Sequence, residues 1–296
     1  MKEIYKNILM LIIVLIITLI VLEFLTRAIY GQNLKYEYTN DTLWELKPTQ
    51  KGFTYPNNKI ATINSYGLRG EEIVSSKESI ILLGDSFIFG YAIGDNDTIS
   101  HNLEEEIKTK QIINGGVPGY GIEQMIELYR KKLRDLNHET IVLTLIKTDI
   151  YRQKSAKDYN KKMFARKAIR KSTLISFLKP RLEIIRELFV TEKEESFNQF
   201  LEKDKKRIIE FKTELMKNGK KLIIFPYITK KEENEFYKEL ENFAKENNIT
   251  ITPNNYKLLE EYNGNPSDLK AEDSHPSEIQ TKIISKFLKE IINKYQ

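Results

Sequence analysis

Cysteine is absent from this sequence, and its absence removes several classes of site at once. Disulfide bonds, thiolate metal sites, cysteine nucleophiles and lipid anchors attached through cysteine are all excluded. Histidine is scarce as well, since His101, His138 and His275 are the only three. Nothing in their spacing indicates a three-histidine zinc site, so we expect neither a metal nor a cofactor.

The chain also lacks a strong excess of one charge. It has 47 basic and 42 acidic residues, a net charge of +5, which is too mild a surplus to favour nucleic acid as a partner. Its 296 residues, 41% of them hydrophobic, suffice for one large α/β domain with additions or for two small domains.

The longest apolar run lies at the N-terminus. Residues 7–26 are almost wholly apolar, and a membrane-spanning helix needs about 20 such residues, so the sequence predicts a single transmembrane anchor at 1–29. Lys2 and Lys6 precede the run and favour a cytoplasmic N-terminus, although Arg27 on the other flank reduces the asymmetry. No small-x-small cleavage site follows. We therefore expect a retained signal anchor, with the rest of the chain outside the cytoplasm.

Residues 30–77 have no helical period, and they include Trp44 and several prolines and glycines. We interpret them as an irregular decoration with short strands. Arg69 lies in a turn-rich piece near the end of this region and could contact an anionic substrate, but a surface ion pair is the favoured interpretation.

Short apolar runs alternate with amphipathic stretches over residues 78–296. The expected strands are Ile80–Leu83, Gln111–Asn114, Ile141–Ile146, Leu222–Phe225 and Ile249–Thr252. The expected helices are Ser100–Lys108, Gly121–Asp135, Phe197–Lys217 and Ser277–Tyr295. Such alternation predicts a mostly parallel five-stranded sheet with helices on both faces.

A long insertion, at about 151–195, separates the third and fourth expected strands. It is dense in lysine and arginine, with apolar residues between them. It could be a basic helical element that binds anionic lipid or an anionic envelope polymer. A solvated helical lid with a lysine-rich face is an equally good interpretation.

Ser86 stands in the position that a nucleophile needs. It follows the apolar run 80–83, which we expect to be a strand buried on both faces, and open α/β sheets bind ligands beyond the carboxyl ends of such strands. Gly84 allows a tight backbone between strand and serine. The alternative is that Asp85 and Ser86 only cap the next helix.

Three further stretches follow expected strands or begin the last helix. Residues 113–121 contain four glycines, which free the backbone to point N–H groups into a site, and their order does not match a dinucleotide loop. Thr148 and Asp149 follow the third strand. His275 comes two residues after Asp273 and three after Glu272, and a histidine with an acidic neighbour can act as a general base.

Taken in order, these motifs resemble those of the SGNH, or GDSL-type, hydrolases, and most closely the bacterial subgroup with an N-terminal membrane anchor. The resemblance covers about residues 60–150 and the part from about 265. It implies a three-layer, flavodoxin-like α/β sandwich. It also implies Ser86 as nucleophile, His275 as base and Asp273 as its partner. The oxyanion hole would consist of Ser86, Gly119 and Thr148.

The sequence departs from the family pattern at two positions. Thr148 stands where the family usually has an oxyanion-hole asparagine, and a threonine hydroxyl donates from a shorter side chain. The common family spacing also puts the acid three residues before the histidine, where this chain has Glu272. We prefer Asp273 and keep Glu272 as the substitute.

The resemblance implies a serine esterase acting on an ester, such as an O-acyl or O-acetyl group of a cell-envelope glycan or lipid. An O-acyltransferase is one alternative. A catalytically lapsed envelope-assembly or binding protein is another, and a lipid-surface-binding protein that uses the basic insertion is a weaker third.

Overall fold

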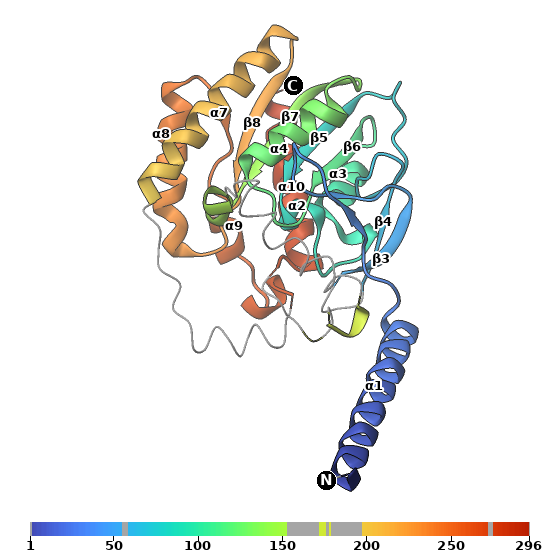
Figure 1. Ribbon diagram of the computed structural model, residues 1–296. Coiled ribbons are helices and arrows are strands. Elements are labelled where there is room, and N and C mark those ends of the chain that lie inside the picture. The colour runs from blue at the N-terminus through green and yellow to red at the C-terminus, as the bar shows by residue number, and fades with distance from the viewer. Residues whose placement is uncertain are drawn as a thin grey trace. The chain divides into compact units, whose positions relative to one another are not determined.

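The computed structural model describes residues 2–54, 59–152, 172–175, 178, 197–271 and 275–295. Two compact units make up this part of the chain. The first contains the N-terminal helix α1 (Lys2–Tyr30) together with residues 172–175 and 178. The second contains the five-stranded sheet and the helices labelled α2, α3, α4, α7, α8, α9 and α10 (Figure 1). Ser86 and His275 both belong to this second unit.

The second unit is built on a five-stranded parallel sheet with strand order β6-β5-β7-β8-β9. Its strands are β5 (Ser79–Gly84), β6 (Gln111–Gly116), β7 (His138–Leu145), β8 (Lys221–Pro226) and β9 (Thr250–Ile251). All six residues of β5 are buried, as a central strand with both faces covered requires. The chain runs from β5 to β6 on one side and then returns to β7 on the other. The order therefore reverses beside β5, where doubly wound sheets bind their ligands.

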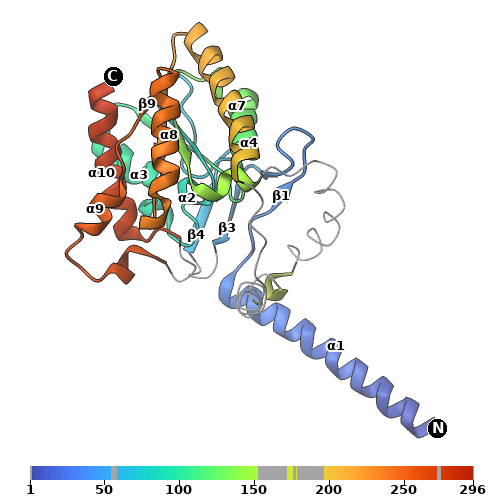
Figure 2. The ribbon, with the colours of Figure 1, turned by 90° about the vertical axis from the view of Figure 1, so that its left-hand side faces the viewer.

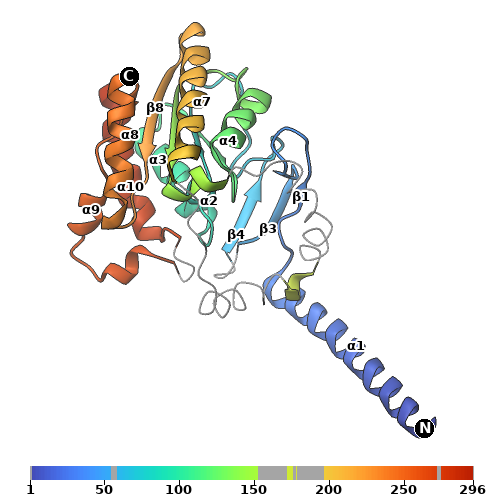
Figure 3. The ribbon, with the colours of Figure 1, turned by 60° about the vertical axis from the view of Figure 1, so that its left-hand side comes forward.

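Helices cover both faces of this sheet. One face packs against α4 (Ile122–Leu128), α7 (Phe197–Lys217) and α8 (Asn234–Glu246), and α4 and α7 lie side by side (Figure 3). The other face packs against α3 (Ile99–Ile107) and α10 (Glu278–Tyr295) (Figure 2). The expected three-layer sandwich with a parallel sheet is confirmed.

The five predicted strands and four predicted helices all exist, with small differences at their ends. The largest concerns residues 121–135, where α4 ends at Leu128 and a π-helical turn, η2 (Tyr129–Leu133), continues it. The prediction missed α8 and two short helices, α2 (Ser86–Phe89) and α9 (Tyr256–Glu260). Most of the basic insertion lies outside the described residues.

The short strands expected in residues 30–77 form two small antiparallel pairs. β1 (Tyr36–Glu37) pairs with β2 (Glu45–Leu46), and β3 (Gln50–Thr54) pairs with β4 (Lys59–Ile63). The segment is pinned to the main sheet through Arg69, whose backbone bridges both Ile63 and Asn114.

The structure contradicts both predictions for the Arg69 side chain, the surface ion pair and the contact with an anionic substrate. Its side chain is fully buried, and its Nε donates to Asp95 Oδ1 at 2.9 Å. The rest of its guanidinium donates to backbone carbonyl groups of Phe89, Gly90, Ile60 and Ile93. A buried guanidinium needs such complete pairing. Arg69 therefore holds the turn after α2 in place, and it is neither a surface ion pair nor a contact for substrate.

Candidate active site

Ser86 lies where β5 gives way to α2. Asp85 is the N-cap of this short helix, since its Oδ1 accepts a hydrogen bond from Phe87 N at 2.9 Å. Ser86 is the first helical residue, and only 7% of its surface is exposed. The capping interpretation is thus correct for Asp85. It does not account for Ser86, whose hydroxyl points elsewhere.

The Ser86 hydroxyl meets the imidazole of His275. The distance from Ser86 Oγ to His275 Nε2 is 2.9 Å, although the two residues are 189 positions apart in the sequence. The loop before α10 carries His275, and this loop is closed by hydrogen bonds from Ala271 N to His275 O and from Ser277 N to Leu269 O. The sequence predicted this pairing of nucleophile and base from motif order, and the structure brings the two residues together.

The single hydrogen of the Ser86 hydroxyl has two acceptors within reach. His275 Nε2 is at 2.9 Å, and Asp85 Oδ2 is at 3.2 Å. The bond to the imidazole is the shorter of the two. When Nε2 carries no proton, the hydroxyl can donate to it, which is the arrangement that general-base catalysis needs.

Aromatic rings enclose the imidazole of His275. The ring centroids of Tyr91 and Phe87 lie 5.1 and 5.5 Å from that of His275. Behind them Tyr227, which is fully buried, packs edge-on against Phe87 at 5.2 Å. Burial raises the pKa of the Tyr227 phenol, so the ring stays neutral. Sequence reasoning missed all three rings, because only Phe87 adjoins a motif.

Asn114 and the glycines after it do not share one role. The Asn114 amide is buried and donates to Ile88 O at 2.8 Å and to Ser100 Oγ at 3.0 Å. It therefore fixes α2 against β6 and supports the site from behind. Gly116 allows the closest approach, since a Cβ there would lie 2.2 Å from Phe89 N.

Gly119, the predicted oxyanion-hole glycine, lies in the turn after β6 with φ of +83°. A side chain there would be strained, and this explains the glycine. The turn is held by Trp44, whose indole Nε1 donates to Pro118 O at 3.2 Å, and by Tyr120, whose hydroxyl donates to Trp44 O at 2.5 Å. No role for Trp44 beyond the decoration is predicted from the sequence, yet Trp44 positions this loop.

Thr148 lies just past β7, in the short helix η3 (Lys147–Arg152), and its side chain is exposed. The next residue, Asp149, is 1% exposed, and its Oδ2 accepts a hydrogen bond from Ile146 N at 2.9 Å. Asp149 thus fixes the turn at the carboxyl end of β7, beside β5. The role of Thr148 in an oxyanion hole stays a prediction.

Asp273 and Glu272 lie outside the described residues. The choice of Asp273 over Glu272 as the partner of His275 therefore stays a prediction. Within the described ranges, no group of three or more histidine, aspartate and glutamate side chains could hold a metal ion.

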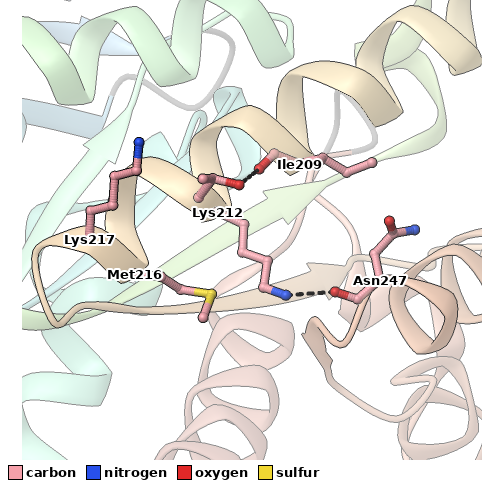
Figure 4. Close-up of a pocket in the computed structure, with 6 residues that line it drawn as sticks. Ile209, Lys212, Met216, Lys217 and Asn247 are labelled. Atoms are coloured by element: carbon pink, nitrogen blue, oxygen red, sulfur yellow. Dashed lines mark hydrogen bonds between the residues drawn. The ribbon is translucent and has the colours of Figure 1, made fainter.

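A surface hollow of about 450 Å³ lies elsewhere on this unit, between α7 and the end of α8. Figure 4 shows Lys212 reaching across it, where its Nζ donates to Asn247 O at 2.6 Å. The hollow is lined by Ile209, Lys212, Thr213, Met216, Lys217 and Asn247. Neither member of the serine–histidine pair lines it, so we do not assign it to the candidate site.

Fold and site together define a flavodoxin-like α/β sandwich with a serine–histidine pair at its switch point. No family profile and no curated protein matches the chain. The solved structures similar to it include a lipolytic protein of the G-D-S-L family, a lipase/acylhydrolase and an acetylxylan esterase.

Three of these structures illustrate the similarity. A G-D-S-L family protein from Desulfitobacterium hafniense is 15% identical over 72% of this chain and 98% of its own, with a TM-score of 0.49. A lipase/acylhydrolase from Enterococcus faecalis is 14% identical over 74% and 96%, with a TM-score of 0.48. The acetylxylan esterase Axe2 from Geobacillus stearothermophilus is 14% identical over 75% and 96%, with a TM-score of 0.45. The fold assignment rests on the strand order itself.

Proposed function

We propose that this protein is a serine ester hydrolase with Ser86 as nucleophile and His275 as general base. The observation that carries the proposal is the 2.9 Å distance from Ser86 Oγ to His275 Nε2 at the carboxyl end of β5. Two residues so far apart in sequence meet at the point where a doubly wound sheet binds its ligand. A nucleophile within hydrogen-bond reach of a base is the signature of covalent catalysis.

The reaction follows from this geometry. His275 Nε2 accepts the hydroxyl proton as Ser86 Oγ attacks the ester carbonyl carbon, and the proton then passes to the leaving alcohol. Water hydrolyses the acyl-enzyme with His275 again as base. The N–H groups of Ser86 and Gly119, with the Thr148 hydroxyl, would stabilise the oxyanion. One such donor contributes roughly 2.7–4 kcal/mol in other serine enzymes.

We infer the substrate class from the membrane anchor, and not from a side chain that recognises the substrate. An apolar N-terminal helix of the length of Glu3–Ile29 would hold the enzyme at a membrane. An ester of an envelope glycan or lipid, such as an O-acetyl group, is the substrate that such an enzyme meets. If a sugar hydroxyl replaces water in the second step, the same site performs acyl transfer.

The test is covalent labelling of the full chain in detergent with a serine-reactive phosphonate. Wild type should be labelled at Ser86, and Ser86→Ala should lose both the label and aryl-ester hydrolysis. Ser65→Ala is the matched control, because the Ser65 hydroxyl bonds to Glu72 in a surface turn. A folded protein that resists the label and cleaves no ester would leave the lapsed assembly factor as the better assignment.

The acid partner of His275 is tested in the same assay. Asp273→Asn should lower ester turnover, because the acid orients the imidazole and stabilises its charged form. Glu272→Gln should have the smaller effect. The opposite order would assign the role to Glu272 and leave the serine–histidine chemistry unchanged.

A further inference from the structure

The one acidic side chain in the apolar stretch of α1 is held by a distant segment of its own unit. Glu23 Oε2 accepts hydrogen bonds from Ser172 Oγ at 2.7 Å and from Leu174 N at 3.0 Å. Its Oε1 accepts from Thr173 N at 2.9 Å. Residues 173–175 begin a helical turn there, so Glu23 takes up amide groups that such a turn leaves unpaired.

The position of Glu23 along the helix fixes the level of this contact. Glu23 is six residues before the end of the apolar span Glu3–Ile29, roughly 9 Å along the axis at the α-helical rise. A carboxylate at that level is costly in lipid unless it is paired, and here Arg27 Nε also bonds to it at 2.6 Å. Neighbouring side chains are apolar and exposed, Phe24 by 69% and Ile29 by 68%.

The docked segment presents apolar side chains of its own. Ile175 is 45% exposed and Leu178 is 41% exposed, although both are large aliphatic residues. In the sequence, Arg170 and Lys171 directly precede the segment. Apolar side chains beside basic residues, at the level where a membrane span ends, have the composition of an interfacial element.

We propose that residues 172–175 and Leu178 form a second membrane contact, held on the anchor by Glu23 and seated in the interfacial layer of the bilayer. Ile175 and Leu178 enter the boundary between head groups and acyl chains. The occupant of this surface is the lipid itself. The anchor helix is then a structural part of the folded protein, because its removal would leave the donors of residues 172–174 without their acceptor.

The test exploits the absence of cysteine, since any single cysteine can be labelled cleanly. Ile175→Cys carries an environment-sensitive fluorophore in the full chain, reconstituted in vesicles of phosphatidylcholine and phosphatidylglycerol. A spin label placed near the head group should quench it at least about twofold more than one near the acyl-chain end. Ile29→Cys and Leu15→Cys serve as shallow and deep standards on the same helix.

Glu23→Gln isolates the docking contact. The substitution replaces one acceptor oxygen by an amide donor that faces Thr173 N, or Ser172 Oγ and Leu174 N. The segment should then leave the anchor, and the fluorescence of the probe at position 175 should rise to its value in vesicles without spin label. Ser172→Ala, which removes one donor, should give a partial rise. Glu3→Gln, the same change at the other end of the helix, should have no effect.

Three outcomes would overturn the proposal. The first is a probe at 175 that neither spin label quenches and that aqueous iodide reaches freely. The second is full quenching in Glu23→Gln, which would show that Glu23 does not hold the segment. The third is protection of the probe only in native membranes and not in pure lipid, which would make the occupant a protein.

Discussion

At the scale of single residues, the predicted role of Thr148 in the oxyanion hole can be tested by substitution. Its exposed hydroxyl is one rotatable donor, whereas an asparagine amide always presents N–H groups and reaches further. Thr148→Asn should therefore raise turnover of a simple aryl ester about tenfold, since each 1.36 kcal/mol of transition-state stabilisation is a factor of ten.

Thr148→Val provides the matched control, because it keeps the shape and removes the hydroxyl. It should lower turnover if Thr148 already donates to the oxyanion. If Thr148→Val leaves ester turnover unchanged and Thr148→Asn does not raise it, Thr148 lies outside the oxyanion hole. The correspondence with the family's third motif is then wrong at this position.

His138 makes the stability of the fold depend on pH. Its ring is 5% exposed, with Nε2 at 3.0 Å from the Tyr129 hydroxyl and Nδ1 at 2.7 Å from Leu136 O. Burial lowers its pKa to about 4. An unfolded histidine titrates near 6.5, so below that pH the unfolded chain binds a proton that the folded chain does not. The free energy of unfolding should therefore fall as the pH drops from about 6.5 to 4, by about 3 kcal/mol at most.

Chemical unfolding in detergent across this pH range measures the effect. His138→Gln removes the titrating group, so its free energy of unfolding should vary less between about pH 6.5 and 4. The variant should also be less stable than wild type at neutral pH. Equal slopes in wild type and His138→Gln would contradict the argument.

At the scale of elements, the approach of α2 to β6 sets the place of Ser86. A Cβ at Gly116 would lie 2.2 Å from Phe89 N and 2.7 Å from Ile88 C, and both are backbone atoms that cannot turn aside. Gly116→Ala should destabilise the fold by about 2–3 kcal/mol and displace α2, with a larger loss of ester turnover than the stability change alone gives. Gly219→Ala is the control, because nothing lies within 4 Å there and only its φ of +69° opposes alanine.

Which elements could be predicted depended on the local pattern. Strands β5 and β7 contain short, mostly apolar runs, and the final helix has a clear period, so each was visible in the sequence. α8 was missed although Phe236, Leu240, Phe243 and Ala244 recur at helical spacing in it and are buried. Helix α2 has only four residues, which are too few to show a hydrophobic period. It exists because Asp85 caps it and the Asn114 amide bonds to its end.

At the scale of the whole molecule, the resemblance of the ordered motifs to those of the SGNH hydrolases predicted that Ser86 and His275 meet. The supporting groups could not be predicted in that way. The sequence favours a surface ion pair or a substrate contact for Arg69 and indicates no supporting role for Asn114, and only packing shows both buried and bonded to backbone. The rings around His275 come from residues 87 and 91, where no sequence period sets them apart from core positions.

The placement of the molecule across the membrane is the remaining prediction at this scale. Lys2 and Lys6 before the apolar span favour a cytoplasmic N-terminus. Protease added outside intact cells or spheroplasts should then digest the chain beyond Thr26. Protection from outside, with digestion only after the membrane is opened, would reverse the orientation. A cytoplasmic protein of known location, probed in the same sample, shows that the membrane stayed closed.

The separation of 189 residues between Ser86 and His275 has a consequence for biogenesis. The serine emerges early in synthesis, whereas its base emerges just ahead of α10. α10 is positioned by late contacts such as Thr281 Oγ1 to Asp97 O and Ser285 Oγ to Ile99 O. These contacts cannot form before α10 has been synthesised. On the proposed function, a partly made or truncated chain would therefore carry an inert serine, and the protein would reach its final location before it could cleave an ester.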